Sequence, residues 1–137
     1  MIKIATKIAW ALYGTPYIYG GKLPLFGLDC SGFTQLIHHE VGLMPDPRTD
    51  ALSSGMQWEK YVDKRIMEPV AGCMVFYGKP DNISHVMFCL NETHCIGAAD
   101  GVNGCYTRGM AQRIDARVKV KPISYRKDIV GYINLFA

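Results

Sequence analysis

The sequence predicts an α+β domain in which N-terminal helices pack on a central antiparallel β-sheet. In the first third of the chain, apolar residues recur at helical spacing, most clearly at Phe33, Leu36, Ile37 and Val41. From about residue 69 the pattern changes to short apolar runs bounded by Gly, Pro, Asn and Asp, which is typical of strands. Helices followed by consecutive strands favour an α+β architecture.

Three helices and five strands follow from these patterns. The expected helices cover residues 1–13, 31–41 and 49–61, with Gly42 ending the second and Thr49 or Asp50 capping the third. The expected strands cover residues 73–77, 84–90, 94–98, 117–123 and 129–136. The imperfect alternation of the fourth strand indicates a sheet edge, and the last strand closes the chain.

Length and composition indicate one domain, residues 1–137, without a second module. The net charge of +3 comes from scattered Lys and Arg residues, so no nucleic-acid partner is expected. No apolar run reaches the length of a membrane span. The first residues are interrupted by Thr6 and Lys7 and precede no cleavage site, so we expect synthesis in the cytoplasm without a signal peptide.

The five cysteines show neither a disulfide framework nor paired metal-ligand spacing. Four of them lie in apolar or strand-like runs and are expected to fill the core as reduced thiols: Cys73, Cys89, Cys95 and Cys105. No metal site and no cofactor are implied.

The fifth cysteine lies where a glycine-rich loop becomes a helix, in the run Leu28-Asp29-Cys30-Ser31-Gly32-Phe33. Asp29 is a good N-cap residue, which would place Cys30 in the first helical turn. The positive end of the helix dipole stabilises a thiolate there, so the pKa of the thiol is expected to fall. The alternative is that Cys30 is one more small, buried, inert residue.

A thiol nucleophile needs a base, usually a histidine that the fold brings close. His38 and His39 lie too far along the helix that Cys30 begins, and His94 starts another strand. His85 lies at the start of the clearest strand, directly after a polar loop, and is the candidate base. A histidine with a purely structural role is the alternative.

Four segments together resemble the NlpC-type cell-wall endopeptidases, a family of papain-like cysteine peptidases. They occur in the family order and at similar separations: Gly14-Thr15-Pro16-Tyr17-Ile18-Tyr19-Gly20-Gly21, Asp29-Cys30-Ser31-Gly32-Phe33, Glu68-Pro69-Val70-Ala71-Gly72-Cys73-Met74-Val75-Phe76-Tyr77, and Ile83-Ser84-His85-Val86. The resemblance covers most of residues 1–100. Any one segment alone would be a weak signal.

This resemblance implies cleavage of peptidoglycan stem peptides between γ-D-glutamate and a diamino acid. Cys30 would be the nucleophile and His85 the base. Tyr17, Asp29 and Ser31 would bind substrate, with the Asp29 carboxylate on a free L-alanine amine and the Tyr17 hydroxyl near the reacting carbonyl. The Cys30 backbone N–H is a candidate oxyanion donor. Asp29 and Ser31 are also ordinary residues for a helix start.

The sequence departs from the family pattern in three places. The family usually has a third polar residue twelve positions after the histidine, but Gly97 stands there, and His94 differs from it in strand parity. Cys73 replaces the usual Gly-Asp at a strand entry. Beyond Gly101 the resemblance fades to general strand character.

Three functional hypotheses remain open at this stage. The first is a peptidoglycan endopeptidase, which without signal or wall-binding segment would reach the cell wall by phage lysis or tail delivery and meet phage structural or lysis proteins. The second is an amidase or acyltransferase that uses the same Cys30–His85 pair. The third is a non-catalytic peptidoglycan-binding or phage assembly module.

Overall fold

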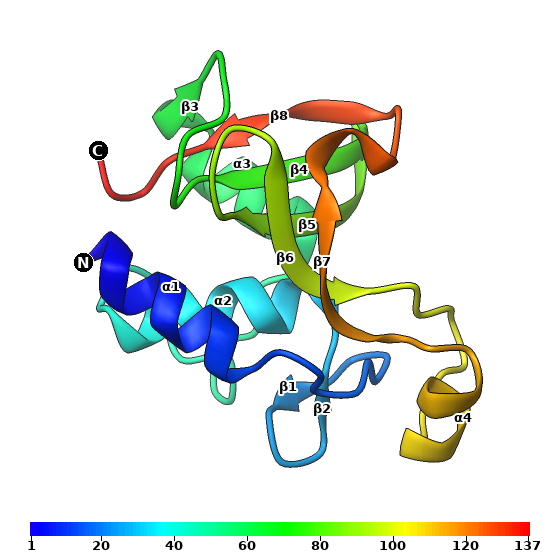
Figure 1. Ribbon diagram of the computed structural model, residues 1–137. Helices are drawn as coiled ribbons and strands as arrows, with labels where there is room; N and C mark the ends of the chain where they lie inside the picture. The colour runs from blue at the N-terminus through cyan, green and yellow to red at the C-terminus, as the bar shows by residue number, and fades with distance from the viewer.

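The computed structural model describes all residues 1–137 (Figure 1). The helices are α1 (Ile2–Ala11), α2 (Cys30–Glu40), α3 (Ser54–Tyr61) and α4 (Arg108–Arg113), with the 3-10 turns η1 (Val62–Lys64) and η2 (Ile123–Tyr125). The strands are β1 (Lys22–Leu23), β2 (Gly27–Leu28), β3 (Arg65–Ile66), β4 (Met74–Lys79), β5 (Asn82–Cys89), β6 (His94–Ala99), β7 (Arg117–Pro122) and β8 (Ile129–Ile133). None of the helices has the length and apolar character needed to cross a bilayer.

A six-stranded antiparallel sheet forms the centre of the molecule, in the order β3-β8-β4-β5-β6-β7. The predicted α+β class is therefore confirmed, and β7 lies at an edge as expected. β8, the last strand of the chain, pairs with both β3 and β4. β1 and β2 form a separate two-stranded hairpin beside the start of α2.

Helices α1, α2 and α3 cover one face of the sheet. Phe33 and Ile37 of α2 pack against Phe88 and Ile96, and α1 joins this cluster through alanines that allow close helix packing. Trp58 of α3 meets the ring of Phe76 edge-on at 5.2 Å between centroids. These positions are buried, so the apolar faces seen in the sequence are the ones that form the core.

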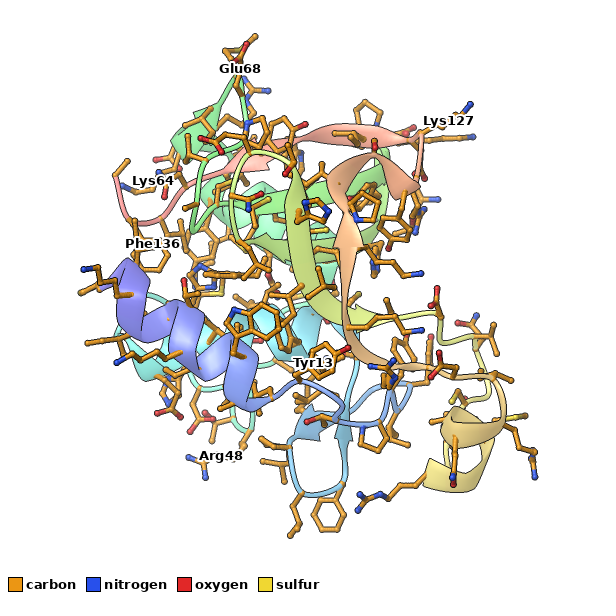
Figure 2. All side chains as sticks on the ribbon, viewed as in Figure 1. Tyr13, Arg48, Lys64, Glu68, Lys127 and Phe136 are labelled. Atoms are coloured by element: carbon orange, nitrogen blue, oxygen red, sulfur yellow. The ribbon has the colours of Figure 1, made fainter.

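The C-terminal tail completes this core. Phe136 lies beside the start of α1 and packs its ring on His38 of α2, with 5.6 Å between ring centroids (Figure 2). The ring of Phe88 lies on another side of His38, at 6.0 Å. The imidazole of His38 is therefore enclosed by aromatic rings.

The other face of the sheet is concave and covered by the chain's own later segments. Tyr77 and Met87 are fully buried there beneath Ile123 of η2. Figure 1 shows the turn between β7 and β8 curling back over the sheet. The predicted core cysteines are buried and unpaired: Cys73, Cys89, Cys95 and Cys105.

Several parts of the chain differ from the sequence prediction. The two-residue strands β1, β2 and β3 were not expected, and β8 ends at Ile133, three residues before the end predicted for the last strand. The third helix begins at Ser54, where Ser53 accepts a hydrogen bond from the Met56 N–H at 3.2 Å. Thr49 and Asp50, the residues expected to cap this helix, instead belong to a turn. Their backbone N–H groups both donate to the backbone carbonyl of Asp46. The prediction of general strand character beyond Gly101 was wrong for α4, which is a helix. This helix is too short to show an apolar stripe in the sequence.

Candidate active site

Cys30 is the first residue of α2, as the capping pattern predicts. The Asp29 carboxylate caps the helix by accepting the Gly32 N–H at 2.6 Å. The Asp29 N–H in turn donates to the Gly21 carbonyl at 3.0 Å, which ties the loop before it to the helix start. The thiol therefore lies among backbone N–H groups that the helix itself does not use.

The loop containing Tyr17 is fixed against both the sheet edge and the helix. Its Tyr17 N–H donates to the Ala116 carbonyl at 3.0 Å. The loop also passes so close to α2 that a Cβ on Gly32 would meet the Gly21 carbonyl oxygen at 2.3 Å. Glycine at position 32 is thus required by the close approach of two backbones.

His85 follows a β-bulge in β5. Gly78 pairs with Ile83 and Tyr77 pairs with His85, so Ser84 is an extra residue opposite β4. Gly78 accommodates the irregularity with a φ of +125°. The residue His85 is 8% exposed, and its ring lies at the mouth of the concave face, beside the Tyr77 ring.

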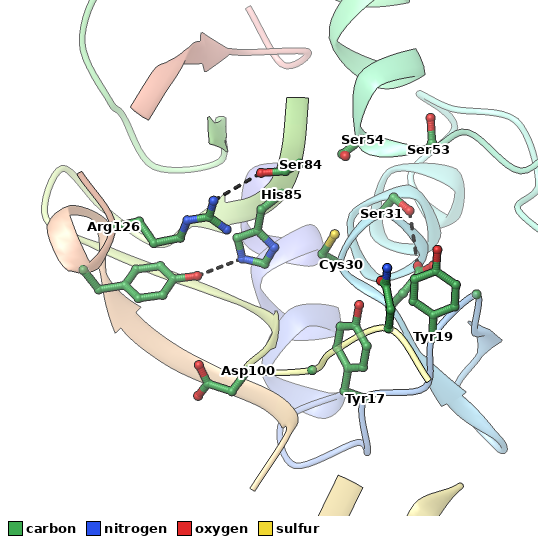
Figure 3. Close-up of a pocket in the computed structure, with 15 residues that line it drawn as sticks. Tyr17, Tyr19, Cys30, Ser31, Ser53, Ser54, Ser84, His85, Asp100 and Arg126 are labelled. Carbon is green, nitrogen blue, oxygen red and sulfur yellow. Dashed lines mark hydrogen bonds between the residues drawn. The ribbon is translucent and has the colours of Figure 1, made fainter. Parts of the chain in front are cut away.

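Cys30 and His85 line the same cleft, which has a volume of about 670 Å³. Figure 3 shows the His85 ring turned toward the Cys30 side chain, with the Tyr17 hydroxyl directed to the same region of the cleft. The predicted residues Asp29 and Ser31 also line this cleft. All five site residues named from the sequence therefore come together in one place.

Burial in the cleft favours the uncharged forms of the Cys30 thiol and the His85 imidazole. Burial raises the pKa of the Cys30 thiol to about 11, with the Asp29 charge adding to the effect, while backbone N–H groups of Val86 and Ser31 and the Lys22 ammonium oppose it. The expected fall in the thiol pKa is therefore wrong for the protein without substrate, because desolvation outweighs the helix start. Burial likewise lowers the pKa of His85 to about 4, with Arg126 adding to the shift.

Asp29 already has a cationic partner. The Lys22 ammonium contacts both Asp29 carboxylate oxygens at 2.8 Å and donates to the Ser31 hydroxyl at 3.2 Å. The Ser31 hydroxyl also donates to Asp29 at 3.2 Å. An amine that approached Asp29 would therefore compete with Lys22, a residue that the sequence pattern did not mark.

Tyr125 is a second site residue that sequence reasoning missed. Its hydroxyl is 2.8 Å from His85 Nε2. In Figure 3 the dashed bond to the His85 ring lies on the side of the ring turned away from Cys30. It lies 40 residues after His85, in a segment where the resemblance had already faded. No local sequence signal identified it.

The position at which the sequence pattern expects a third polar residue has no such role here. A Cβ on Gly97 would meet the Met87 sulfur at 2.5 Å, so the Met87 side chain occupies the space that a side chain at position 97 would need. His94 is exposed at the start of β6 and contacts the Thr93 hydroxyl at 2.9 Å. The parity argument against His94 is consistent with this placement.

A thiol at a helix start facing an imidazole on a neighbouring antiparallel sheet defines the molecule as a papain-like α+β domain. The NlpC/P60 family model matches residues 14–121. The chain therefore belongs to the NlpC/P60 family. The suspected resemblance is confirmed at the level of the family.

Solved structures support the fold. The NlpC/p60 domain of the peptidoglycan hydrolase SagA aligns with a TM-score of 0.66 at 23% identity, over 98% of both chains. An NlpC/P60 family protein from Bacillus cereus aligns with a TM-score of 0.77 at 18% identity, over 100% of this chain but 41% of its own. The peptidoglycan hydrolase RipB from Mycobacterium tuberculosis aligns with a TM-score of 0.71 at 21% identity, over 97% of this chain and 63% of its own. A search of curated proteins found no match.

Proposed function

We propose that this protein is a cysteine peptidase that hydrolyses peptidoglycan stem peptides, with Cys30 as nucleophile and His85 as general base. The observation that carries the proposal is the Cys30 thiol at the start of α2, facing a buried His85 imidazole in a cleft. Membership of the NlpC/P60 family and the structural likeness to peptidoglycan hydrolases support the proposed substrate class.

The neutral state of both groups sets the order of proton transfers. As the Cys30 sulfur attacks the amide carbonyl carbon, its proton passes to His85, so the charge forms only when substrate is present. The imidazolium then protonates the leaving amine as the C–N bond breaks, leaving a thioester on Cys30. Water, deprotonated by His85, attacks the thioester and releases the carboxylic acid and the free thiol.

Negative charge on the carbonyl oxygen needs hydrogen-bond donors during both attacks. The Cys30 N–H is the first of α2 and has no intrahelical acceptor by its position. The Tyr17 hydroxyl is directed toward Cys30, and burial keeps the pKa of this phenol above its usual value, so it stays protonated and able to donate. These two groups are the proposed oxyanion donors.

The bond that we propose is the one between γ-D-glutamate and the diamino acid. Ser31, which is buried and lines the cleft, would contact the L-alanyl part of the substrate together with Asp29. Since Lys22 already pairs with Asp29, the site favours an L-alanine whose nitrogen is in amide linkage, as it is in the intact wall. The proposed place of action is therefore the cell wall.

The test is digestion of purified peptidoglycan and of an N-acylated L-Ala-γ-D-Glu-diamino acid peptide under reducing conditions, read by mass spectrometry. We expect wild type to release a fragment ending at D-glutamate. Cys30→Ala and His85→Ala should each lower the rate by at least about 1,000-fold, because nucleophile and base act as a unit. The matched control is His94→Ala, which removes an exposed histidine and should keep full activity.

Other outcomes identify the alternatives. Cleavage at the lactyl amide, or transfer of the acyl group to an added amine, would indicate an amidase or acyltransferase with the same pair. Peptidoglycan binding without turnover would indicate a binding module. Full cleavage by Cys30→Ala would contradict the mechanism.

A further inference from the structure

A histidine that takes a proton from a thiol needs its second ring nitrogen held, because that bond fixes the ring orientation and the tautomer. Gly97, the β6 residue twelve positions after His85, has no side chain and is packed against Met87. His85 Nε2 instead contacts the Tyr125 hydroxyl at 2.8 Å. This bond comes from η2, beyond residues 14–121 that the family model matches.

We propose that Tyr125 is the positioning residue of the active site: its hydroxyl oxygen accepts the His85 Nε2–H and so leaves Nδ1 free to take the Cys30 proton. The proposal rests on the proposed Cys30–His85 chemistry. In this role Tyr125 acts through His85.

Tyr125 is held rigidly enough for this role. The Tyr77 hydroxyl donates to the Ile123 carbonyl at 2.7 Å, which anchors η2 to the floor of the concave face. The Tyr77 ring also contacts both partners, with 5.6 Å between centroids to His85 and 5.6 Å to Tyr125. On the outer side, the Lys121 ammonium lies 5.1 Å from the centre of the Tyr125 ring. One buried tyrosine thus orients both members of the pair.

The chemistry of the bond suits a base that is neutral at rest. A phenol oxygen accepts only weakly from a neutral imidazole, but the bond strengthens once His85 carries the proton from Cys30. Burial keeps the pKa of Tyr125 above its usual value, so the phenol brings no negative charge that would protonate His85 in advance. Charged groups also act on the ring: Arg126 disfavours the imidazolium, whereas Asp100 and Asp128 favour it.

A phenol differs from a carboxylate in that it can also donate. If the Tyr125 O–H donated to Nε2, the imidazole would carry its proton on Nδ1, facing Cys30, and could not act as the base. The tautomer of His85 therefore decides the proposal directly, without any substrate.

The experiment compares wild type, Tyr125→Phe and Tyr132→Phe. Phenylalanine at 125 removes the hydroxyl and keeps the ring that packs on Tyr77. Tyr132→Phe is the matched control, since Tyr132 packs against the same buried cluster but is not a hydrogen-bond partner of His85. Imidazole ¹⁵N chemical shifts give the tautomer at pH 7, and steady-state kinetics on the peptide give kcat and KM.

We expect His85 to carry its proton on Nε2 in wild type and in Tyr132→Phe, and to become a mixture of tautomers in Tyr125→Phe. We expect kcat to fall by about 10- to 100-fold in Tyr125→Phe with KM within about twofold, because ring orientation matters only in the chemical step. A proton on Nδ1 in wild type would overturn the proposal, as would an unchanged tautomer and kcat in Tyr125→Phe. If wild type cleaves no peptide, the proposed function fails while the tautomer comparison still decides the role of Tyr125.

Discussion

At the scale of single residues, the Asp29 carboxylate in the cleft is already paired with a cation, Lys22. Lys22 and Asp29 form an ion pair at 2.8 Å, with side chains only 20% and 14% exposed. Asp29 also caps α2, so it stays in place whether or not Lys22 is present. Under the proposed function, Lys22 would therefore decide which substrate terminus Asp29 accepts.

Replacing Lys22 should change specificity for the substrate's amino end. In Lys22→Met, a free L-alanine ammonium can take the place of the lysine on Asp29. We expect the ratio of kcat/KM for the free-amine tripeptide to that for its N-acetyl form to rise by about 10- to 100-fold, since a charge-assisted hydrogen bond contributes about 1.5–3 kcal/mol. Competition assays with the two peptides measure the ratio.

The control for this substitution is Arg48→Met, which breaks the Arg48–Asp46 pair outside the cleft. It should leave the ratio unchanged. An unchanged ratio in Lys22→Met would mean that Asp29 serves only as a helix cap.

At the scale of elements, the site depends on how closely the Tyr17 loop approaches the start of α2. A Cβ on Gly32 would meet the Gly21 carbonyl oxygen at 2.3 Å and the Asp29 carboxylate at 2.8 Å. Because the nearest obstacle is backbone, the loop must move as a unit. That movement would displace the cap and the proposed oxyanion donors together.

Gly32→Ala should therefore lower both the stability of the protein and its activity. We expect a loss of about 1–3 kcal/mol in the free energy of unfolding, typical of overpacking, and a fall in kcat/KM of about 100-fold or more. Gly55→Ala is the matched control, because it lies in α3 with nothing within 4 Å and should be neutral or slightly stabilising. Urea unfolding and peptide kinetics on both variants give the comparison; wild-type activity in Gly32→Ala would contradict it.

The sequence predicted those elements whose local pattern is strong. Asp29 before an apolar stripe located α2 and Cys30, and the apolar run after Ser84 located β5 and His85. It did not predict β1, β2 and β3, since each is two residues long and carries no pattern. Tyr125 was missed because only the curl of the sheet brings η2 to β5, and Lys22 because an ion pair across seven residues depends on the loop's path.

At the scale of the whole molecule, the core contains an uncharged histidine whose burial links stability to pH. His38 is fully buried between Phe88 and Phe136, and burial lowers its pKa from 6.5 to about 4. Its Nδ1 contacts the Thr34 carbonyl at 2.7 Å, while Nε2 has no hydrogen-bond partner. The ring is therefore stable in the fold only as the neutral form.

The sign of the pH dependence of stability follows from the lowered pKa of His38. Between pH 6.5 and 4 the unfolded chain binds a proton at residue 38 and the folded protein does not, so acid favours unfolding. Stability is complete above pH 6.5 and falls as the pH drops toward 4, by about 3 kcal/mol for this one histidine. His85, whose pKa is also lowered to about 4, adds a second contribution of the same sign.

His38→Phe should lower the slope of the free energy of unfolding against pH between 6.5 and 4 by the amount that corresponds to about one bound proton. The lost hydrogen bond to Thr34 should in addition cost about 1 kcal/mol at every pH. Urea unfolding at half-unit pH steps measures the slope. A general loss of stability displaces the whole curve without changing its slope, so the two effects separate. An unchanged slope would mean that the core admits a charged His38, and that the enclosure by Phe88 and Phe136 opens in acid before the domain unfolds.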